Sequence, residues 1–368
     1  MNVETISLTP GPMGGTRDLT VYRFGQPGAR PRVYIQGGLH ADEAPGMLVG
    51  FALRDHLARL EAEGAIHGEI LLVPVANPIG LDQGVAGGSA GRFEATTGQN
   101  FNRDFPDAAQ LALLQDDSPP QGDCVSTLRK RMLAGLDALA PMTQLAALQR
   151  ALLRLAISAD IVIDMHCDSE ATTHLYCHSE QVDRAAGFGH AVNAGVVLHA
   201  RLQGGASFDE ACALPWSAFR DRWPGTAIPL ACFAVTLEWR GMLDTDPATA
   251  ENDAEAVVAW LAAQDVLSAK AATACERSVA VAPLAGVEVV TAPRSGLFLA
   301  TALPGTQVIA GTVLGQLRCL PDGELHVLRA STDGLLYARE QTRIVRSGAE
   351  LFFIAGQTPI RHGMLLST

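Results

Sequence analysis

The chain has 368 residues, of which 48% are hydrophobic and 18% are charged, and it carries a net charge of −12. This length predicts two domains, and this composition is typical of a folded globular protein rather than a disordered one. The negative charge, with no basic run longer than residues 129–131, argues against nucleic acid as a partner.

Several other classes of protein are disfavoured by features that the chain lacks. Its N-terminus shows no signal-peptide pattern and no apolar run approaches 18 residues, so we expect no membrane span. Seven scattered cysteines without a C-x-x-C pair favour reduced thiols and a cytoplasmic location. Lys130 and Lys270 are the only lysines, which argues against a phosphate-binding P-loop and against Schiff-base chemistry.

Residues 32–265 alternate between strand-like and helical patterns. This rhythm predicts an α/β catalytic domain over residues 1–270, with a mostly parallel or mixed sheet covered by helices on both faces. In such sheets ligands bind outside the carboxyl ends of the strands. The predicted strands are 33–39, 69–75, 160–165, 194–198 and 231–237, and the predicted helices are 44–63, 125–139, 143–157 and 251–267.

Residues 271–368 form a second predicted domain, a small all-β barrel or sandwich. Short β-type runs replace the helical patterns, segment 295–298 is echoed by 333–336, and segment 308–311 is echoed by 345–348. Such half-motifs are found in lipoyl and biotinyl carrier domains, which need an acceptor lysine. The segment contains no lysine, so we expect a structural role or a lid instead.

His40 and Glu43 directly follow the first predicted strand. If a helix begins there, the two side chains project from one edge of its first turn. Imidazole nitrogen and carboxylate oxygen, with one further nitrogen, make the three-ligand set of a catalytic zinc site. His166 ends the predicted strand 160–165 and offers that nitrogen at the same edge of the sheet. Asp164 and Asp168 are candidates to orient its ring, with an ordinary strand-end turn as the alternative.

A zinc hydrolase also needs a general base and a cation that takes up charge on the carbonyl oxygen. Glu238 ends an apolar strand and is the candidate base, with an ion pair to Arg240 as the alternative. Arg92, in a glycine-rich loop, is the candidate cation. His174 and His178 are expected to be solvated or hydrogen-bonded, with a reservation that they line the pocket.

A polar loop supplies a candidate anchor for the substrate. Asn102 and Arg103 suit a carboxylate, because a guanidinium binds both oxygens and an amide adds a donor. The alternative is a structural ion pair between Arg103 and Asp104.

In order and spacing, these motifs resemble the succinylglutamate desuccinylase/aspartoacylase family of the zinc carboxypeptidase (M14-like) superfamily. The resemblance covers residues 30–265, and the appended β-domain also fits it. It implies one Zn2+ per chain held by His40, Glu43 and His166, with Glu238 as base, Arg92 stabilising the oxyanion, and Asn102 and Arg103 binding a carboxylate. The segments that carry it are His40-x-x-Glu43, Asn77-Pro78-Ile79-Gly80, Asn100-Phe101-Asn102-Arg103-Asp104-Phe105-Pro106, Asp164-Met165-His166 and Leu237-Glu238-Trp239-Arg240.

We therefore predict a cytoplasmic zinc-dependent hydrolase that acts on a small N-acyl amino acid or related compound. Its size and fold class are typical of enzymes that form homo-oligomers. The alternatives are a metallocarboxypeptidase that trims peptides and a catalytically silent carboxylate-binding protein. Residues 87–91 match the G-x-S-x-G motif of serine hydrolases, but the strand and the helix that must flank Ser89 are not predicted there.

Overall fold

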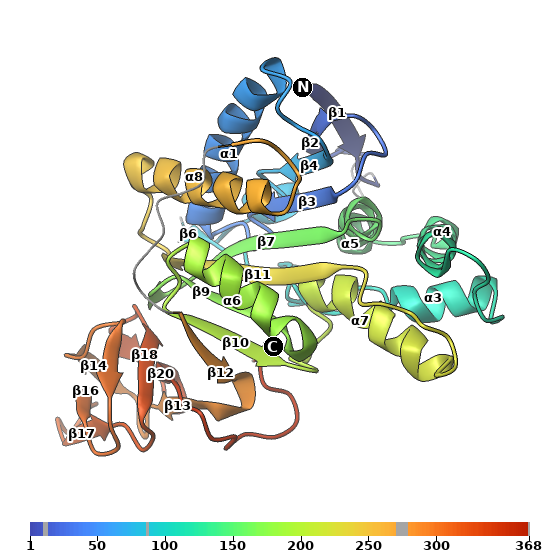
Figure 1. Cartoon of the computed structure of the whole chain (residues 1–368). Helices are drawn as coiled ribbons and strands as arrows, with labels where there is room; N and C mark the ends of the chain where they lie inside the picture. The colour runs from blue at the N-terminus through green and yellow to red at the C-terminus, as the bar shows by residue number, and fades with distance from the viewer. Residues whose placement is uncertain (10–13, 86–87, 270–278, 367–368) are drawn as a thin grey trace.

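The computed structural model describes residues 1–9, 14–85, 88–269 and 279–366. It consists of a large α/β layer structure followed by small β-sheets at the C-terminal end (Figure 1). No helix in these ranges is long and apolar enough to cross a membrane.

The largest sheet is mixed and has nine strands. Its central strands are parallel to their neighbours, with antiparallel pairs at the N-terminal edge and at one internal boundary. In spatial order the strands are β1 (Asn2–Ser7), β2 (Asp18–Gly25), β4 (Glu69–Val73), β3 (Arg32–Gly37), β7 (Ile161–Asp168), β11 (Phe233–Gly241), β9 (His174–His178), β10 (Val196–Ala200) and β12 (Ala280–Pro283).

Helices cover both faces of this sheet, as predicted (Figure 1). Successive strand residues point to opposite faces, so Val33 and Ile35 pack in one core and Tyr34 packs in the other. One face carries α1 (Ala44–Ala62), α6 (Val182–Ala191) and α8 (Pro247–Ala263), and the other carries α3 (Ala108–Gln115), α4 (Cys124–Ala138), α5 (Gln144–Ala156) and α7 (Phe208–Arg222). The short elements are α2 (Pro78–Leu81), the 3-10 turns Ser179–Gln181 and Leu284–Gly286, and the strand pair β5 (Gly84–Val85) and β6 (Gly88–Ser89).

Three of the four predicted helices begin where a side-chain oxygen caps them. Asp123, Thr143 and Asp246 accept hydrogen bonds from backbone N–H groups in the first turns of α4, α5 and α8. Helices α3, α6 and α7 and strands β1, β2 and β9 were not predicted from sequence. In α7 the reason is Pro215, which lies inside the helix and removes one of its backbone donors.

Two small antiparallel sheets form most of the C-terminal region and enclose an apolar core between them. One sheet contains β13 (Val287–Thr291), β20 (Glu350–Ala355), β18 (Gly334–Arg339) and β15 (Thr306–Val308), and the other contains β17 (Leu325–Arg329), β16 (Val313–Cys319), β14 (Gly296–Ala300) and β19 (Ile344–Val345).

The weak sequence repeat corresponds to an exchange of strands between the two halves of this region. The echoed segments start β14 at Gly296 and β18 at Gly334. Strand β14 pairs with β19 of the second half, and β18 pairs with β15 of the first half. The predicted division at residue 270 falls outside the described residues. Strand β12, which follows it, belongs to the large sheet, so the domain boundary remains a prediction.

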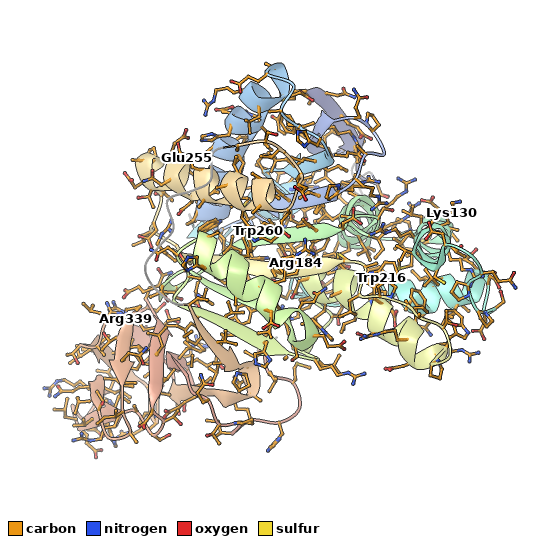
Figure 2. The ribbon with its side chains drawn as sticks, viewed as in Figure 1. Lys130, Arg184, Trp216, Glu255, Trp260 and Arg339 are labelled. Atoms are coloured by element: carbon orange, nitrogen blue, oxygen red, sulfur yellow. The ribbon has the colours of Figure 1, made fainter. Side chains whose placement is uncertain are left out.

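The C-terminal region is attached to the large sheet by backbone pairing and ion pairs. Strand β8 (Glu170–Ala171), which follows β7, pairs with β18. Arg339 lies at this junction, where its Nε donates to Glu170 Oε2 at 2.5 Å (Figure 2). Arg343 donates to the other oxygen of Glu170, and Thr172 N donates to Tyr337 O at 2.8 Å. The region is therefore fixed beside the end of β7, where the predicted site lies.

Candidate metal centre and substrate cavity

The carboxyl ends of neighbouring strands bring the predicted site residues together. His166 on β7 is the register partner of Glu238 on β11, and Glu238 is in turn the partner of His174 on β9. Residues paired across a ladder point to the same face of the sheet, so these three side chains form a row. His40 and Glu43 follow β3, the neighbour of β7 on the other side.

His40 and Glu43 meet through a turn rather than through a helix. The helix α1 begins at Ala44, so Glu43 is its N-cap residue and His40 lies outside it. The backbone N–H of Glu43 donates to the carbonyl oxygen of His40 at 3.1 Å. This bond closes a turn that places residues i and i+3 together, as the first turn of a helix would. The predicted proximity is therefore present, but its structural cause differs from the one expected.

His40, Glu43 and His166 form a buried group that fits a metal ion. His40 Nδ1 lies 2.8 Å from Glu43 Oε1, and His166 Nδ1 lies 2.7 Å from Glu43 Oε2. One ligand atom from each of the three residues lies within 4.8 Å of the others. Two imidazoles and one carboxylate are the ligands of a catalytic zinc site with an open position.

The other ring nitrogens are held by oxygen acceptors, which supports this fit. His40 Nε2 lies 2.8 Å from Asn100 Oδ1, and His166 Nε2 lies 3.0 Å from Asp164 Oδ2. These oxygens accept from each Nε2, so Nδ1, the ring atom that faces Glu43, is the atom that would bind a metal ion. Asp164 is itself held by Gln36, whose Nε2 donates to its other oxygen at 2.9 Å. Both imidazoles are thus oriented with Nδ1 toward Glu43, as a shared metal ion would require.

The same contacts keep the carboxylate of Glu43 ionised. Burial would raise the pKa of Glu43, but the adjacent imidazoles of His40 and His166 hold this pKa well below its usual range. Burial lowers the pKa of His40. For His166 burial acts in the same direction, but Asp164 and Glu43 raise its pKa well above the usual value. An ionised carboxylate between two imidazoles is ready to bind a cation.

Glu238 has the environment expected of a proton-transfer group. Burial, assisted by the charge of Glu43, raises its pKa to about 8. Its Oε2 is buried and has no hydrogen-bond partner among the residues that the structure describes. The alternative pair with Arg240 does not form, because a register shift after Glu238 turns Arg240, at φ 53°, toward Asp253.

Of the two aspartates expected to orient His166, Asp164 does so and Asp168 does not. Asp164 contacts His166, whereas Asp168 lies 3.9 Å from His174 Nε2. His174 and His178 are buried on β9 and hydrogen-bonded, which is one of the two expected environments, and neither lines the cavity described below. The Nδ1 of His174 lies 2.8 Å from Thr172 O.

The predicted cation and substrate anchor lie beside this group. Arg92 Nη1 is 3.1 Å from Glu43 Oε1 and 3.2 Å from His40 Nδ1. Asn102 Nδ2 is 3.3 Å from His166 Nε2, and Asn102 Oδ1 accepts from the backbone N–H of Phe208 at the start of α7.

Arg103 is buried in the same loop. Its Nη1 donates to the carbonyl oxygen of Asn102 at 2.7 Å. Burial lowers the pKa of Arg103, and Arg92 acts in the same direction. Asp104 is exposed and accepts from Gln99, and the structure shows no hydrogen bond or ion pair between Arg103 and Asp104.

All seven predicted site residues line a single cavity of about 520 Å³. Other residues of the cavity wall were not predicted from the sequence, because they belong to no motif and come from distant segments of the chain. Asn100 is the first residue of the motif at residues 100–106, but its contact with His40 was not predicted. The missed lining residues include Tyr176, Gln203 and Asp209 from the sheet region and Tyr337, Glu340, Glu350, Phe353 and Arg361 from the C-terminal region.

The serine-hydrolase motif has no matching structure. Gly87 lies outside the described residues, and Ser89 ends the two-residue strand β6. Residues 90–107 contain no helix, although the motif requires one directly after the serine.

Known proteins of similar sequence and fold indicate one family. The model of the succinylglutamate desuccinylase/aspartoacylase catalytic domain matches residues 29–263, which is more than half of the chain. A crystal structure of a protein of that family from Shewanella amazonensis has 26% identity and a TM-score of 0.84, over 96% of this chain and 98% of that chain.

Two further crystal structures share the fold. The Shewanella frigidimarina protein has 23% identity and a TM-score of 0.83, over 96% of this chain and 97% of its own. The Rhodobacter sphaeroides protein has 17% identity and a TM-score of 0.67, over 97% of this chain and 96% of its own. No curated protein matches the chain. On the match of the catalytic-domain model, the chain belongs to the succinylglutamate desuccinylase/aspartoacylase family.

Proposed function

We propose that the protein is a zinc-dependent deacylase that hydrolyses the amide bond of a small N-acyl amino acid or related compound. The observation that carries the proposal is the buried group of His40, Glu43 and His166 on the wall of the cavity. Membership of a family of amidohydrolases supports the same reaction class.

Each residue of the cavity would have a distinct task. One zinc ion per chain, held by His40, Glu43 and His166, would act as a Lewis acid and lower the pKa of water. Glu238 would accept the proton of the attacking water and deliver it to the leaving nitrogen. A pKa near the working pH allows both steps, and that of Glu238 is about 8. Arg92, which lies beside the metal ligands, would stabilise negative charge on the carbonyl oxygen.

The substrate would be held by its carboxylate. Asn102 and Arg103 lie on the cavity wall next to His166 and can offer amide and guanidinium donors. The far wall comes from the C-terminal region, including Tyr337, Glu350 and Leu365. A cavity bounded on that side favours a small molecule over a peptide, so a carboxypeptidase is the weaker candidate.

The structure also bears on the third candidate, a silent binding protein. Such a protein needs the carboxylate anchor but has no use for a buried carboxyl group beside the metal ligands. Glu238 is such a group, and its pKa is raised. We further propose a cytoplasmic location, since the six cysteines in the described ranges are all free. A homo-oligomer remains an expectation from the fold class.

Substitution of the base tests the proposed reaction. We expect Glu238→Gln to bind zinc stoichiometrically and to lose turnover by about 10²- to 10⁴-fold, because only proton transfer is removed. The measurements are zinc content and release of free amine from a panel of N-acetyl and N-succinyl amino acids. Normal turnover in the variant would show that Glu238 is not the base, and no hydrolysis by zinc-loaded wild type would contradict the deacylase proposal.

A further inference from the structure

One wall of the cavity combines carboxylates with aromatic rings. Tyr337 and Glu340 come from β18 and its end, and Glu350 and Phe353 come from the neighbouring strand β20. Glu340 N donates to Leu351 O at 3.0 Å, so the two glutamates lie at the same end of this strand pair. The ring centroids of Tyr337 and Phe353 are 6.1 Å apart. We call these four residues the C-terminal wall.

The charges of the cavity lining are unbalanced. The lining contains seven carboxyl groups and three arginines. Glu43 belongs to the proposed metal group and Glu238 is the proposed base. A third, Asp209, is satisfied by Gln203 Nε2 at 2.6 Å and Ser207 Oγ at 2.5 Å. The surplus of negative charge is therefore shared by the four remaining carboxyl groups, Asp42, Asp168, Glu340 and Glu350.

Glu340 and Glu350 carry much of this surplus. In the described part of the chain neither forms an ion pair, and Glu340 Oε1 accepts a hydrogen bond from Thr342 N. The arginines on either side of Glu340, Arg339 and Arg343, both bind Glu170 instead. One lining arginine, Arg361, also comes from the C-terminal region, so the two half-buried carboxylates outnumber it and leave a net negative charge in this part of the cavity.

The opposite side of the cavity has the complementary charge. Arg92 and Arg103 lie there, next to the metal group. A ligand that matches both sides has an anionic group for the arginines and a cationic group for the C-terminal wall. Carboxylates and the faces of aromatic rings are the protein groups that bind ammonium and guanidinium ions.

We propose that Glu340 and Glu350, together with Tyr337 and Phe353, form a subsite that selects N-acyl compounds whose amine part carries a positive charge, such as N-acylated basic amino acids. The inference rests on the proposed deacylase function and names the substrate class of the same site. In this view the C-terminal wall selects the substrate, and the residues at the sheet edge cleave its amide bond.

The test compares substrates of similar shape and different charge. Nα-acetyl-L-lysine, Nα-acetyl-L-norleucine and Nα-acetyl-L-glutamate are offered to zinc-loaded protein, with kcat/KM from amine release and Kd from calorimetry. We expect the lysine compound to be preferred over the norleucine compound by about tenfold in both measurements. The preference should decrease as the salt concentration is raised, because salt screens the attraction between the ammonium group of the ligand and the two glutamates.

Matched variants locate the preference. The double variant Glu340→Gln/Glu350→Gln should reduce the lysine-to-norleucine ratio about tenfold. Glu324→Gln, an exposed glutamate of the same region that pairs with Arg294, should leave the ratio unchanged. Because a ratio is measured on one protein sample, partial unfolding of a variant does not alter it.

The outcomes separate this inference from the proposed function. Equal or better use of the norleucine or glutamate compound by wild type overturns the inference and leaves the deacylase proposal standing. An unchanged ratio in the double variant also overturns it. Preferred binding of the lysine compound without any hydrolysis supports the subsite and contradicts the deacylase proposal.

Discussion

The two walls of the cavity are built on different physical principles. At the sheet edge the polar side chains are buried, with His40 3%, His166 1% and Asp164 0% exposed, and hydrogen bonds orient the imidazoles. On the C-terminal wall Glu340 and Glu350 are half-buried and lack ion-pair partners among the described residues. The imidazoles at the sheet edge, where bonds would be made and broken, are thus held in fixed positions. The carboxylates of the C-terminal wall, where a substrate would be selected, lack ion-pair partners in the part of the chain that the structure describes.

The attachments of the two walls differ as well. His166 and Glu238 lie on paired central strands of the nine-stranded sheet. The C-terminal wall is joined to that sheet by the short β8–β18 pair, by Glu170 and by a shared apolar cluster. Substitutions at the sheet edge should therefore affect metal binding and turnover, whereas substitutions at the junction should affect substrate binding.

The largest effect is expected from removal of a metal ligand. His166→Ala should reduce zinc content from one per chain to a small fraction, because a three-ligand site loses one donor and leaves Glu43 with a single imidazole. Metal analysis after dialysis measures this. The control is His362→Ala, an exposed histidine of the C-terminal region. Stoichiometric zinc in the His166 variant would contradict the proposed site.

A smaller loss of metal affinity is expected when the support of a ligand is removed. Asn100→Ala takes away the acceptor that holds His40 Nε2 at 2.8 Å, and zinc affinity should fall by about 10- to 100-fold. Competition with a chelating dye gives the affinity. Gln99→Ala, the adjacent amide that contacts Asp104, is the matched control. Equal affinities in both variants would mean that Asn100 does not orient the ligand.

The buried carboxyl group of Asp209, on the sheet side of the cavity, should make the stability of the protein depend on pH. Burial, with the neighbouring charge of Glu210, raises the pKa of Asp209 from 3.8 to about 6. The folded protein holds this proton more tightly than the unfolded chain, so its stabilising contribution is complete below about pH 4 and is lost as pH rises through about 6. The loss is of the order of 3 kcal/mol, about 1.4 kcal/mol for each pKa unit.

Asp209→Asn should remove this dependence. Urea unfolding of chelator-treated protein at pH 4 to 8 measures it, with exposed Asp221→Asn on the same helix as control. Relative to wild type, the Asp209 variant should become more stable as the pH rises from 4 to 7. A constant difference between the two proteins over this range would show that Asp209 does not titrate as described.

The smallest effect is expected at the junction between the two regions. Arg339→Ala removes a partly exposed ion pair with Glu170 and should raise KM two- to fivefold, at most about 1 kcal/mol, with zinc content unchanged. Steady-state kinetics with the preferred substrate gives both constants, and the control is Arg294→Ala, which breaks an ion pair with Asp322, neither residue lining the cavity. A fall in zinc content of the Arg339 variant would show that the two walls are not independent.

The sheet edge could be predicted from the sequence because its chemistry requires specific residue types at strand ends. His40, His166 and Glu238 follow or end apolar runs, and these runs are the observed strands β3, β7 and β11. The turn that joins His40 to Glu43 could not be told from a helix, since both place residues i and i+3 together.

The C-terminal wall could not be predicted for the opposite reason. Glu340 and Glu350 are ordinary glutamates in short strands, and only the packing of β18 against β8 brings them to the cavity. Strand β9 was missed because His174 and His178 resemble exposed residues in sequence but are buried in the fold. Long-range packing, which local patterns do not encode, decides both cases.

The central claim is that His40, Glu43 and His166 hold the metal of a hydrolase. The most direct measurement is an anomalous difference map at the zinc edge from crystals grown with one equivalent of zinc per chain. The account predicts one strong peak between His40 Nδ1, His166 Nδ1 and the carboxylate of Glu43. A peak instead at the surface group of His56, Glu251 and Glu255, the other cluster in the described residues that could hold a metal, would contradict it.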